Sequence, residues 1–418
     1  SGGLVAQPKS GFSRHVALRC AMKFQQLSGP VMAKGLEDTA FYRFNRFVAL
    51  NEVGGHPETF GTTLSAFHRA NQQRADHWPH ALLSSSTHDT KRGEDTRARL
   101  AALSELPEEW QRQVQAWSRI LRARRGDVEG TAPPDRNDEY LFYQLLLGAW
   151  PVELLDDAMD QAVLDTLKER LKGAMTKSVR EAKVHTSWTA PDQAYEDAVL
   201  GFVDDALDAE RSNAFLDAFR PFALRVATLG ATNTLLQTVL KLTVPGVPDI
   251  YQGADLWDLS LVDPDNRRPV DYEQREQLLA DVSLALARDR GHAMRSFFED
   301  WRDGRFKMAA IQALLQHRRR CPALFGQGSY EPVAATGTDA ERVCAFLRRH
   351  EGQALLVIAA RFPGRGTSID AQLPALTDLQ GRNWRDLLTG RDVELGGGGQ
   401  PITDLLTDLP VAVLVNGS

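Results

Sequence analysis

The chain has 418 residues, of which 43% are hydrophobic and 25% are charged. This length allows two or three domains, and this composition is typical of a folded protein rather than a disordered one. The formal net charge of −6 argues against nucleic acid or an anionic membrane as a partner. Three cysteines without CxxC spacing, and no apolar run long enough for a bilayer, predict a cytoplasmic protein without a cysteine-rich zinc site.

The first predicted element is a helix over residues 12–28, and a segment without sustained period follows over 29–55. This segment mixes aromatic and charged residues, as sugar binding requires, because each pyranose ring has an apolar face and a polar rim. Phe41, Tyr42 and Phe44 suit the faces, and the polar candidates are Lys34, Arg43, Asn45, Asn51 and Glu52. The alternative is that the aromatic residues are core and that the charges pair internally, with Glu37 or Asp38 bound to Arg43.

In residues 81–86, apolar side chains are followed by small serines, which predicts a buried strand that ends at His88 and Asp89. Polar groups at the carboxyl end of a parallel barrel strand are typical of an active site. Asp89 suits sugar hydroxyls and a positively charged transition state, and Lys91 and Arg92 are placed to orient it. The alternative is that Asp89 caps the next helix.

Residues 96–242 follow a helical pattern, in which Trp110 and Trp117 are predicted to be core. The basic run Arg122–Arg125 is interpreted as a solvated helix face. The stretch from His185 to Trp188 is interpreted as a helix terminus with a packed Trp188, with a loop returning to the strand ends as the alternative.

A second strand is predicted over 247–251, followed by an acidic loop that contains Arg267 and Arg268. Arginine forks bind carboxylates bidentately, so the loop either orders itself by ion pairs or contacts a ligand. Its spacing does not match a calcium loop. Helices are predicted over 271–288 and 306–319, and strands over 343–347, 354–360 and 411–415, with a glycine loop at 396–399.

Zinc, nucleotide and serine-nucleophile patterns are missing from the sequence, which leaves carboxylate chemistry or no catalysis at all, and we expect no metal and no cofactor. Four stretches resemble maltooligosyl trehalose synthases, a family of the α-amylase superfamily (glycoside hydrolase family 13). They are GPVMAKGLEDTAFYRFNRFVALNEVGG (29–55), SSTHDTKRGEDTRAR (85–99), REAKVHTSWTAPDQAYE (180–196) and VPGVPDIYQGADLWDLSLVDPDNRRPVDY (244–272).

The resemblance implies an α/β plus β fold: the C-terminal portion of a (β/α)8 barrel, a large helical insertion and a C-terminal antiparallel β domain. The implied divisions are 1–96, a partial barrel with its seventh strand; 97–243, the helical insertion; 244–335, the eighth strand and closing helices; and 336–418, the β domain. The implied reaction is intramolecular transfer, which converts the reducing-end α-1,4 link of a maltooligosaccharide into an α,α-1,1 link with retention.

By resemblance, Asp89 is the carboxylate that stabilises the transition state and His88 is its substrate-binding neighbour. Lys34, Lys91 and the segment Phe41 to Arg43 are expected at the reducing-end glucose, and Arg92, Glu52, Arg267 and Arg268 complete the candidate set. The family's Asp nucleophile and Glu acid/base are expected upstream of Ser1, in an N-terminal half that this chain would need as its partner. The alternatives are a hydrolysing amylase relative and a non-catalytic maltodextrin-binding or scaffold protein.

Overall fold

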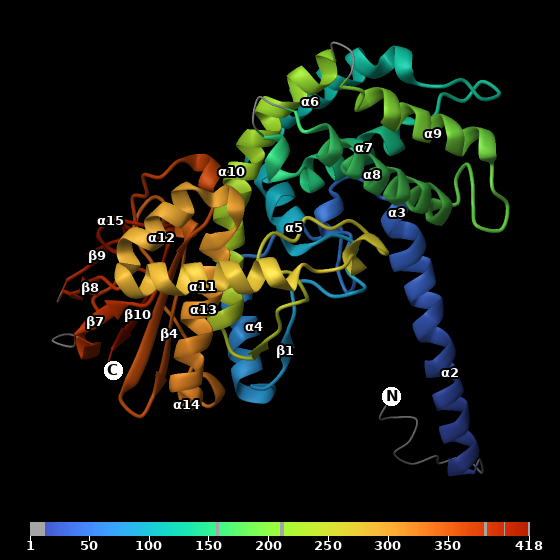
Figure 1. Ribbon diagram of the computed structural model, residues 1–418. Helices are drawn as coiled ribbons and strands as arrows, with labels where there is room; N and C mark the ends of the chain where they lie inside the picture. Colours follow the sequence, from blue (N-terminus) through green and yellow to red (C-terminus); the bar gives the residue numbers. More distant parts are fainter. Residues whose placement is uncertain (1–12, 156–158, 210–212, 380–382, 397, 417–418) are drawn as a thin grey trace.

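The computed structural model describes residues 13–155, 159–209, 213–379, 383–396 and 398–416. Its first element is α2 (Arg14–Gly35), which extends away from the remainder of the molecule (Figure 1). The helix continues as a π-helical turn, η1 (Leu36–Ala40), and then as α3 (Phe41–Arg43). The predicted helix is therefore present but ends later than expected, since the segment that showed no clear period is also helical up to Arg43.

Two short strands lie at the centre of the fold, where the sequence predicted longer ones. β1 (Leu82–Leu83) pairs in parallel with β2 (Val247–Pro248), and the backbone N–H groups of Val247 and Asp249 donate to the carbonyls of Ala81 and Leu83. The strands predicted over 81–86 and 247–251 are thus in the right places but too long. A ladder extends only as far as a neighbour pairs with it, and among the described residues β1 and β2 pair only with each other.

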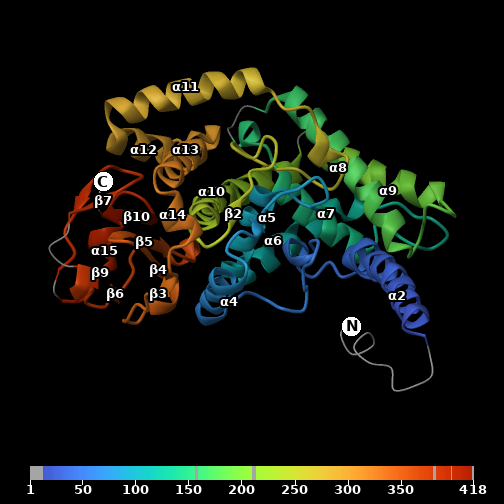
Figure 2. The same cartoon turned by 90° about the horizontal axis from the view of Figure 1, so that it is seen from below.

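Helices before and between these two strands surround a common core (Figures 1 and 2). Trp117 is fully buried and packs on Trp110 and Phe219, with ring centroids 5.7 and 5.2 Å apart, as core residues at helical spacing should. The long α10 packs against α5 and, beyond this block, against α13. The elements are η2 (Val48–Leu50), α4 (Leu64–His77), α5 (Glu94–Ala101), η3 (Ala102–Glu105), α6 (Pro107–Ile120), η4 (Leu121–Arg124), α7 (Arg136–Ala149), η5 (Val152–Leu154), α8 (Gln161–Ala182), α9 (Gln193–Ala206) and α10 (Ala214–Thr243).

A second group of helices follows β2 and covers one face of the terminal sheet. The predictions over 271–288 and 306–319 are confirmed by α11 (Tyr272–Arg288) and α13 (Arg305–Arg320). Between and around them lie η6 (Asp265–Arg267), α12 (Arg290–Glu299), η7 (Trp301–Asp303) and α14 (Pro322–Gly326).

The last part of the chain forms an antiparallel sheet of order β3-β4-β5-β10-β7-β8. Alternate residues of its central strands face two different cores: Phe346 and Val357 join the helical core, whereas Ala345 and Ile358 join a smaller one under the outer loops. Because both faces of the central strands are buried, successive residues are apolar on either side and the sequence of each strand is a continuous apolar run. The elements are β3 (Glu331–Pro332), η8 (Ala340–Arg342), β4 (Val343–His350), β5 (Gln353–Ala360), η9 (Pro363–Arg365), β6 (Gln372–Leu373), η10 (Thr377–Leu379), β7 (Trp384–Asp386), β8 (Asp392–Val393), β9 (Gln400–Pro401), α15 (Ile402–Leu405) and β10 (Val411–Asn416).

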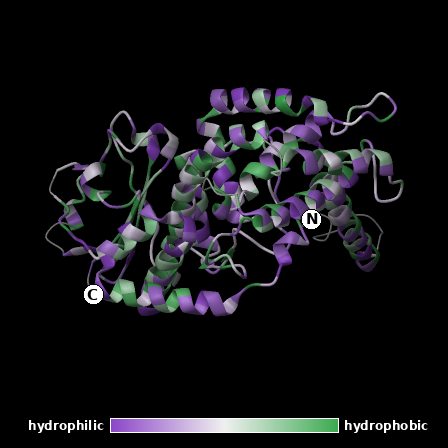
Figure 3. Ribbon diagram, turned by 45° about the horizontal axis from the view of Figure 1, so that its top comes forward, coloured by the Kyte–Doolittle hydropathy of each residue, from purple (hydrophilic) through white to green (hydrophobic). Residues whose placement is uncertain are grey.

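Hydrophilic and hydrophobic residues alternate along the helices (Figure 3). Within the described residues, no helix has the length and apolar character needed to cross a membrane. The predicted glycine loop at 396–399 includes residue 397, which lies outside the described residues.

Candidate active site

The turn that carries His88 and Asp89 follows β1, and both residues are exposed. The Asp89 carboxylate makes no hydrogen bond or ion pair with any described residue, whereas its backbone N–H donates to Thr87 Oγ1 over 3.1 Å. Helix α5 begins at Glu94 with Gly93 as its N-cap and no side-chain cap. The alternative that Asp89 caps this helix is therefore wrong, and its carboxylate is available to a ligand.

Glu52 fixes one side of this turn. Its carboxylate accepts hydrogen bonds from the backbone N–H groups of Lys91 and Arg92, over 2.6 and 3.1 Å. Each carboxylate oxygen thus holds one backbone N–H of the turn, which gives Glu52 a positioning role, while its contact with sugar stays a prediction. The Arg92 guanidinium is also buried, and it donates to the Asn51 carbonyl over 3.1 Å.

Asn266 fixes the other side of the turn. Its amide nitrogen lies 3.0 Å from the carbonyl oxygens of His88 and Thr90 and 3.4 Å from that of Thr87. Arg267 adds a weaker bond of 3.3 Å to the His88 carbonyl. The Asn266 side chain thus binds three backbone carbonyls of the turn, and the side chains of His88 and Asp89 take no part in these bonds. This role of Asn266 could not be predicted, because a loop sequence does not show which carbonyls a side-chain amide will contact.

A carboxylate bridges the two lysines expected near the sugar. Lys34 Nζ lies 2.5 Å and Lys91 Nζ lies 3.5 Å from Asp38, which replaces the predicted pairing of Asp38 with Arg43. The hydrogen bond to Asp38 raises the pKa of Lys34, and the charge of Asp89 adds to this effect. Burial opposes ionisation of Asp38, but the hydrogen bond from Lys34 and the charge of Lys91 hold its pKa below its ordinary value. Lys34 and Lys91 thus share one carboxylate beside the Asp89 turn.

Three other predicted residues take structural roles. Phe41 and Tyr42 are 1% and 2% exposed, so their rings belong to the core and are not free to stack on a sugar, as the alternative interpretation of this segment proposed. Lys91 Nζ lies over the Tyr42 ring at 5.1 Å from its centroid. Arg43 is turned away from the turn and donates to the carbonyls of Ala182 and Lys183.

The loop after β2 is ordered by ion pairs and also borders a cavity. Arg170 binds Asp265 through two bonds of 2.9 Å, and Lys177 pairs with Asp263, so both carboxylates belong to the structure of the loop. Arg268 pairs with Asp265 at 3.0 Å and lines a cavity of about 250 Å³ together with Asn266. The two readings of this loop, ion pairing and ligand contact, are therefore compatible.

A buried ion cluster lies directly behind the turn. Lys307 Nζ lies 2.7 Å from Glu94 and 2.8 Å from Asp95, and Lys241 Nζ lies 3.1 Å from Glu94. Burial opposes ionisation of Glu94, but the charges of Lys307 and Lys241 outweigh it and lower its pKa to about 2. Asp95 also accepts a bond of 2.7 Å from the backbone N–H of Asp258. This cluster joins the start of α5 to α10, α13 and the loop after β2, and so anchors the base of the turn.

The described residues hold no group of three or more His, Cys, Asp and Glu side chains arranged for a metal ion. What the site offers is one exposed carboxylate on a turn fixed by its backbone, with lysine and arginine side chains beside it. This arrangement suits hydrogen bonding to hydroxyl groups and stabilisation of a developing positive charge.

Comparison with known proteins shows which proteins this chain resembles. No family model matches the chain. Curated proteins from two Mycobacterium tuberculosis strains, whose names assign them as maltooligosyl trehalose synthases, are 38% identical over 398 residues, which is 94% of this chain and 45% of theirs. The structure of maltooligosyltrehalose synthase from Arthrobacter ramosus matches with a TM-score of 0.76 and 35% identity, over 95% of this chain and 46% of that one.

Another solved maltooligosyl trehalose synthase matches with a TM-score of 0.76 and 30% identity, over 97% of this chain and 50% of that chain. The resemblance predicted from the four motifs is thus confirmed: the chain is homologous to the maltooligosyl trehalose synthases over nearly all of its length, and it spans about half of theirs.

Proposed function

We propose that this chain forms part of the active site of a trehalose-forming enzyme that acts on maltooligosaccharides. One observation carries the proposal: Asp89 is exposed and unpaired within the described residues, on a turn whose backbone is fixed from both sides by Glu52 and Asn266. A carboxylate held in this way is prepared for a ligand, since its geometry is set before binding and its charge is not already neutralised.

The proposed reaction is an intramolecular transfer with retention. A carboxylate nucleophile attacks the anomeric carbon beside the reducing-end glucose, and an acid donates a proton to the departing 4-oxygen. The released glucose then turns, and its anomeric hydroxyl attacks the glycosyl intermediate while the acid, now a base, removes its proton. Asp89 stabilises the positive charge that develops at the anomeric carbon in both steps, and His88 binds a hydroxyl of the same sugar.

The nucleophile and the acid/base are proposed to come from a polypeptide that corresponds to the part of the relatives that this chain does not span. The surface around β1 supports this partner. Leu82 is 77% exposed and the nearby Trp78 is 72% exposed, although both are large hydrophobic residues beside a strand. Helix α2 likewise exposes Phe24 and Leu27. Such apolar surface next to an incomplete parallel sheet is typical of a protein–protein interface.

The test is a hybrid protein in which this chain replaces the matching 46% of the Arthrobacter ramosus enzyme. With maltopentaose, we expect a non-reducing product of unchanged mass with an α,α-1,1 link, measured by loss of reducing ends and by NMR. Release of shorter reducing sugars instead would identify a hydrolase. A folded hybrid without either product, together with calorimetric binding of maltopentaose to the isolated chain, would favour a binding or scaffold protein.

A further inference from the structure

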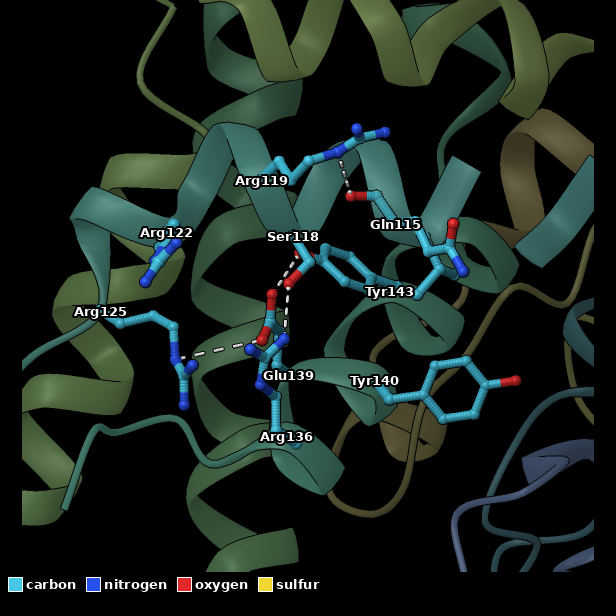
Figure 4. Close-up of a pocket in the computed structure, with 10 residues that line it drawn as sticks. Gln115, Ser118, Arg119, Arg122, Arg125, Arg136, Glu139, Tyr140 and Tyr143 are labelled. Atoms are coloured by element: carbon cyan, nitrogen blue, oxygen red, sulfur yellow. Dashed lines mark hydrogen bonds and ion pairs between the residues drawn. The ribbon is translucent and has the colours of Figure 1, made fainter. Parts of the chain in front are cut away.

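A cavity in the helical block, remote in sequence from the Asp89 turn, contains an unusual concentration of positive charge. It has a volume of about 410 Å³ and lies between α6, η4 and α7 (Figure 4). Its lining includes Arg119, Arg122, Arg125 and Arg136, with Glu139 as the one acidic residue. The sequence interpretation of Arg122–Arg125 as a solvated helix face is therefore incomplete, because two of these residues border a cavity.

The single carboxylate does not neutralise these arginines. Glu139 is 2% exposed and accepts a hydrogen bond of 2.8 Å from the Tyr143 hydroxyl. Its contact with Arg125 is 4.0 Å long, at the limit of an ion pair. Three positive charges therefore remain in excess at the cavity of a protein whose formal net charge is −6.

Three of the four arginines are oriented by hydrogen bonds to neutral partners. Arg125 donates to the carbonyls of Ala132 and Pro134 over 2.7 and 3.0 Å. Arg136 donates to the Ser118 hydroxyl and Arg119 to the Gln115 carbonyl, both over 3.1 Å. Arg122 has no hydrogen bond or ion pair within the part of the chain that the structure describes. These contacts fix positions without removing charge, and like charges so gathered repel one another until an anion binds.

We infer that this cavity binds a small phosphorylated metabolite. Guanidinium groups bind phosphate oxygens through pairs of parallel hydrogen bonds, and several around one cavity select for multiple negative charges. The volume lies within the range of small-molecule sites. The half-buried ring of Tyr140 supplies apolar surface for the remainder of such a ligand.

The site is connected to the segment that precedes the Asp89 turn in the chain. Tyr140, which lines the cavity, donates to the Arg46 carbonyl over 3.3 Å. On the same helix, Asn137 donates to the Arg43 carbonyl over 3.2 Å and Gln144 to the Asn45 carbonyl over 2.8 Å. A ligand that orders α6 and α7 therefore also stabilises the segment 43–48.

The experiment titrates the chain with inorganic pyrophosphate at fixed ionic strength, by calorimetry, with thermal unfolding as a second readout. We expect one binding site and a rise in Tm. Arg122→Gln should weaken binding at least about tenfold, because it removes one charge-assisted contact. Arg122 is exposed and makes no contact that folding requires, so this variant should fold normally.

Arg124→Gln is the matched control, since Arg124 is the next-but-one residue, pairs with Asp205 at 3.8 Å and does not line the cavity. It changes the net charge equally and should leave the affinity unchanged. Absence of binding to the unmodified chain would overturn the inference, and so would equal weakening in the two variants, which would show nonspecific attraction. Citrate bound as tightly as pyrophosphate would reject the preference for phosphate.

Discussion

Asp89 and Asp95 are six residues apart, and their carboxylates have opposite surroundings. Asp89 is exposed and has no hydrogen-bonding or ion-pair partner among the described residues. Asp95 is fully buried, where it binds Lys307 at 2.8 Å, the Thr234 hydroxyl at 2.8 Å and the Asp258 backbone N–H at 2.7 Å. The carboxylate of Asp89 is thus available to a ligand, whereas that of Asp95 is bound by groups of the protein itself.

The contacts that stabilise this region therefore involve other residues than the carboxylate that we propose for catalysis. The backbone of the turn is held by Glu52 and Asn266, and the following helix is anchored by the cluster of Glu94, Asp95, Lys241 and Lys307. None of these contacts uses the Asp89 carboxylate. Substitutions in the two groups should therefore have separable effects, on unfolding for the buried cluster and on turnover for the exposed carboxylate.

The largest expected effect is that of Lys307→Met on stability. Methionine approximates the volume of lysine but leaves Glu94 and Asp95 buried without their common partner, so the free energy of unfolding should fall by about 3–5 kcal/mol. Thermal or urea unfolding of the chain measures this. Lys172→Met is the control: Lys172 pairs with Glu169 and Asp204 on the surface, where about 1 kcal/mol or less is expected. Equal effects of the two substitutions would contradict the role of the cluster.

Asp89→Asn should act on turnover alone. Removing one preorganised charge that stabilises a transition state lowers kcat about 10²- to 10³-fold, or about 2.7–4 kcal/mol. Because no described residue bonds to this carboxylate, Tm should stay unchanged. Both are measured in the hybrid enzyme, with Asp76→Asn, an exposed residue of α4, as the control. Normal turnover in Asp89→Asn would exclude Asp89 from the mechanism.

Within the buried cluster, Glu94 predicts an acid-sensitive stability, whereas burial raises the pKa of Asp95 and acts in the opposite direction. The pKa of Glu94 is about 2 in the folded chain against an ordinary value of 4.5, so its ionised form stabilises the fold above pH 4.5. This contribution, on the order of 3 kcal/mol, should be lost as the pH falls from 4.5 towards 2. Unfolding measured across this range should show a weaker pH dependence in Glu94→Gln, and an unchanged dependence would refute the assignment.

The sequence predicted the helices and the C-terminal strands β5 and β10 better than the central strands β1 and β2, for a physical reason. The helix over 271–288 coincides with α11 to within a residue, because its apolar period and the Asp271 cap lie within the segment itself. The strand predicted over 81–86 is two residues long, since pairing depends on β2, more than 160 residues away in the chain. Trp188, predicted to be packed, is 52% exposed and lies under the Arg180 guanidinium. A local sequence pattern does not show which contacts a residue makes with distant parts of the chain.

The candidate site shows the same limit. The resemblance led to Asp89, His88 and their cationic neighbours, which the structure does bring to one turn. It did not reveal that Glu52 and Asn266 hold this turn, or that Lys241 and Lys307 meet Glu94, because these partners come from distant elements. Residue type suggested sugar binding for Glu52, whereas only the fold shows that both of its oxygens bind backbone N–H groups of the turn.

The smallest expected effect is that of Glu52→Gln, which tests whether Glu52 positions the turn or binds sugar directly. Glu52→Gln keeps one oxygen acceptor but replaces the other with a donor that faces the N–H of Lys91 or Arg92, so unfolding should become easier by about 1–2 kcal/mol. The turn should loosen, and turnover in the hybrid should fall less than in Asp89→Asn, with Glu58→Gln, an exposed residue, as the control. If Glu52 bound sugar directly, KM would rise while stability stayed constant. Loss of stability together with a lower kcat is the pattern that a positioning residue requires.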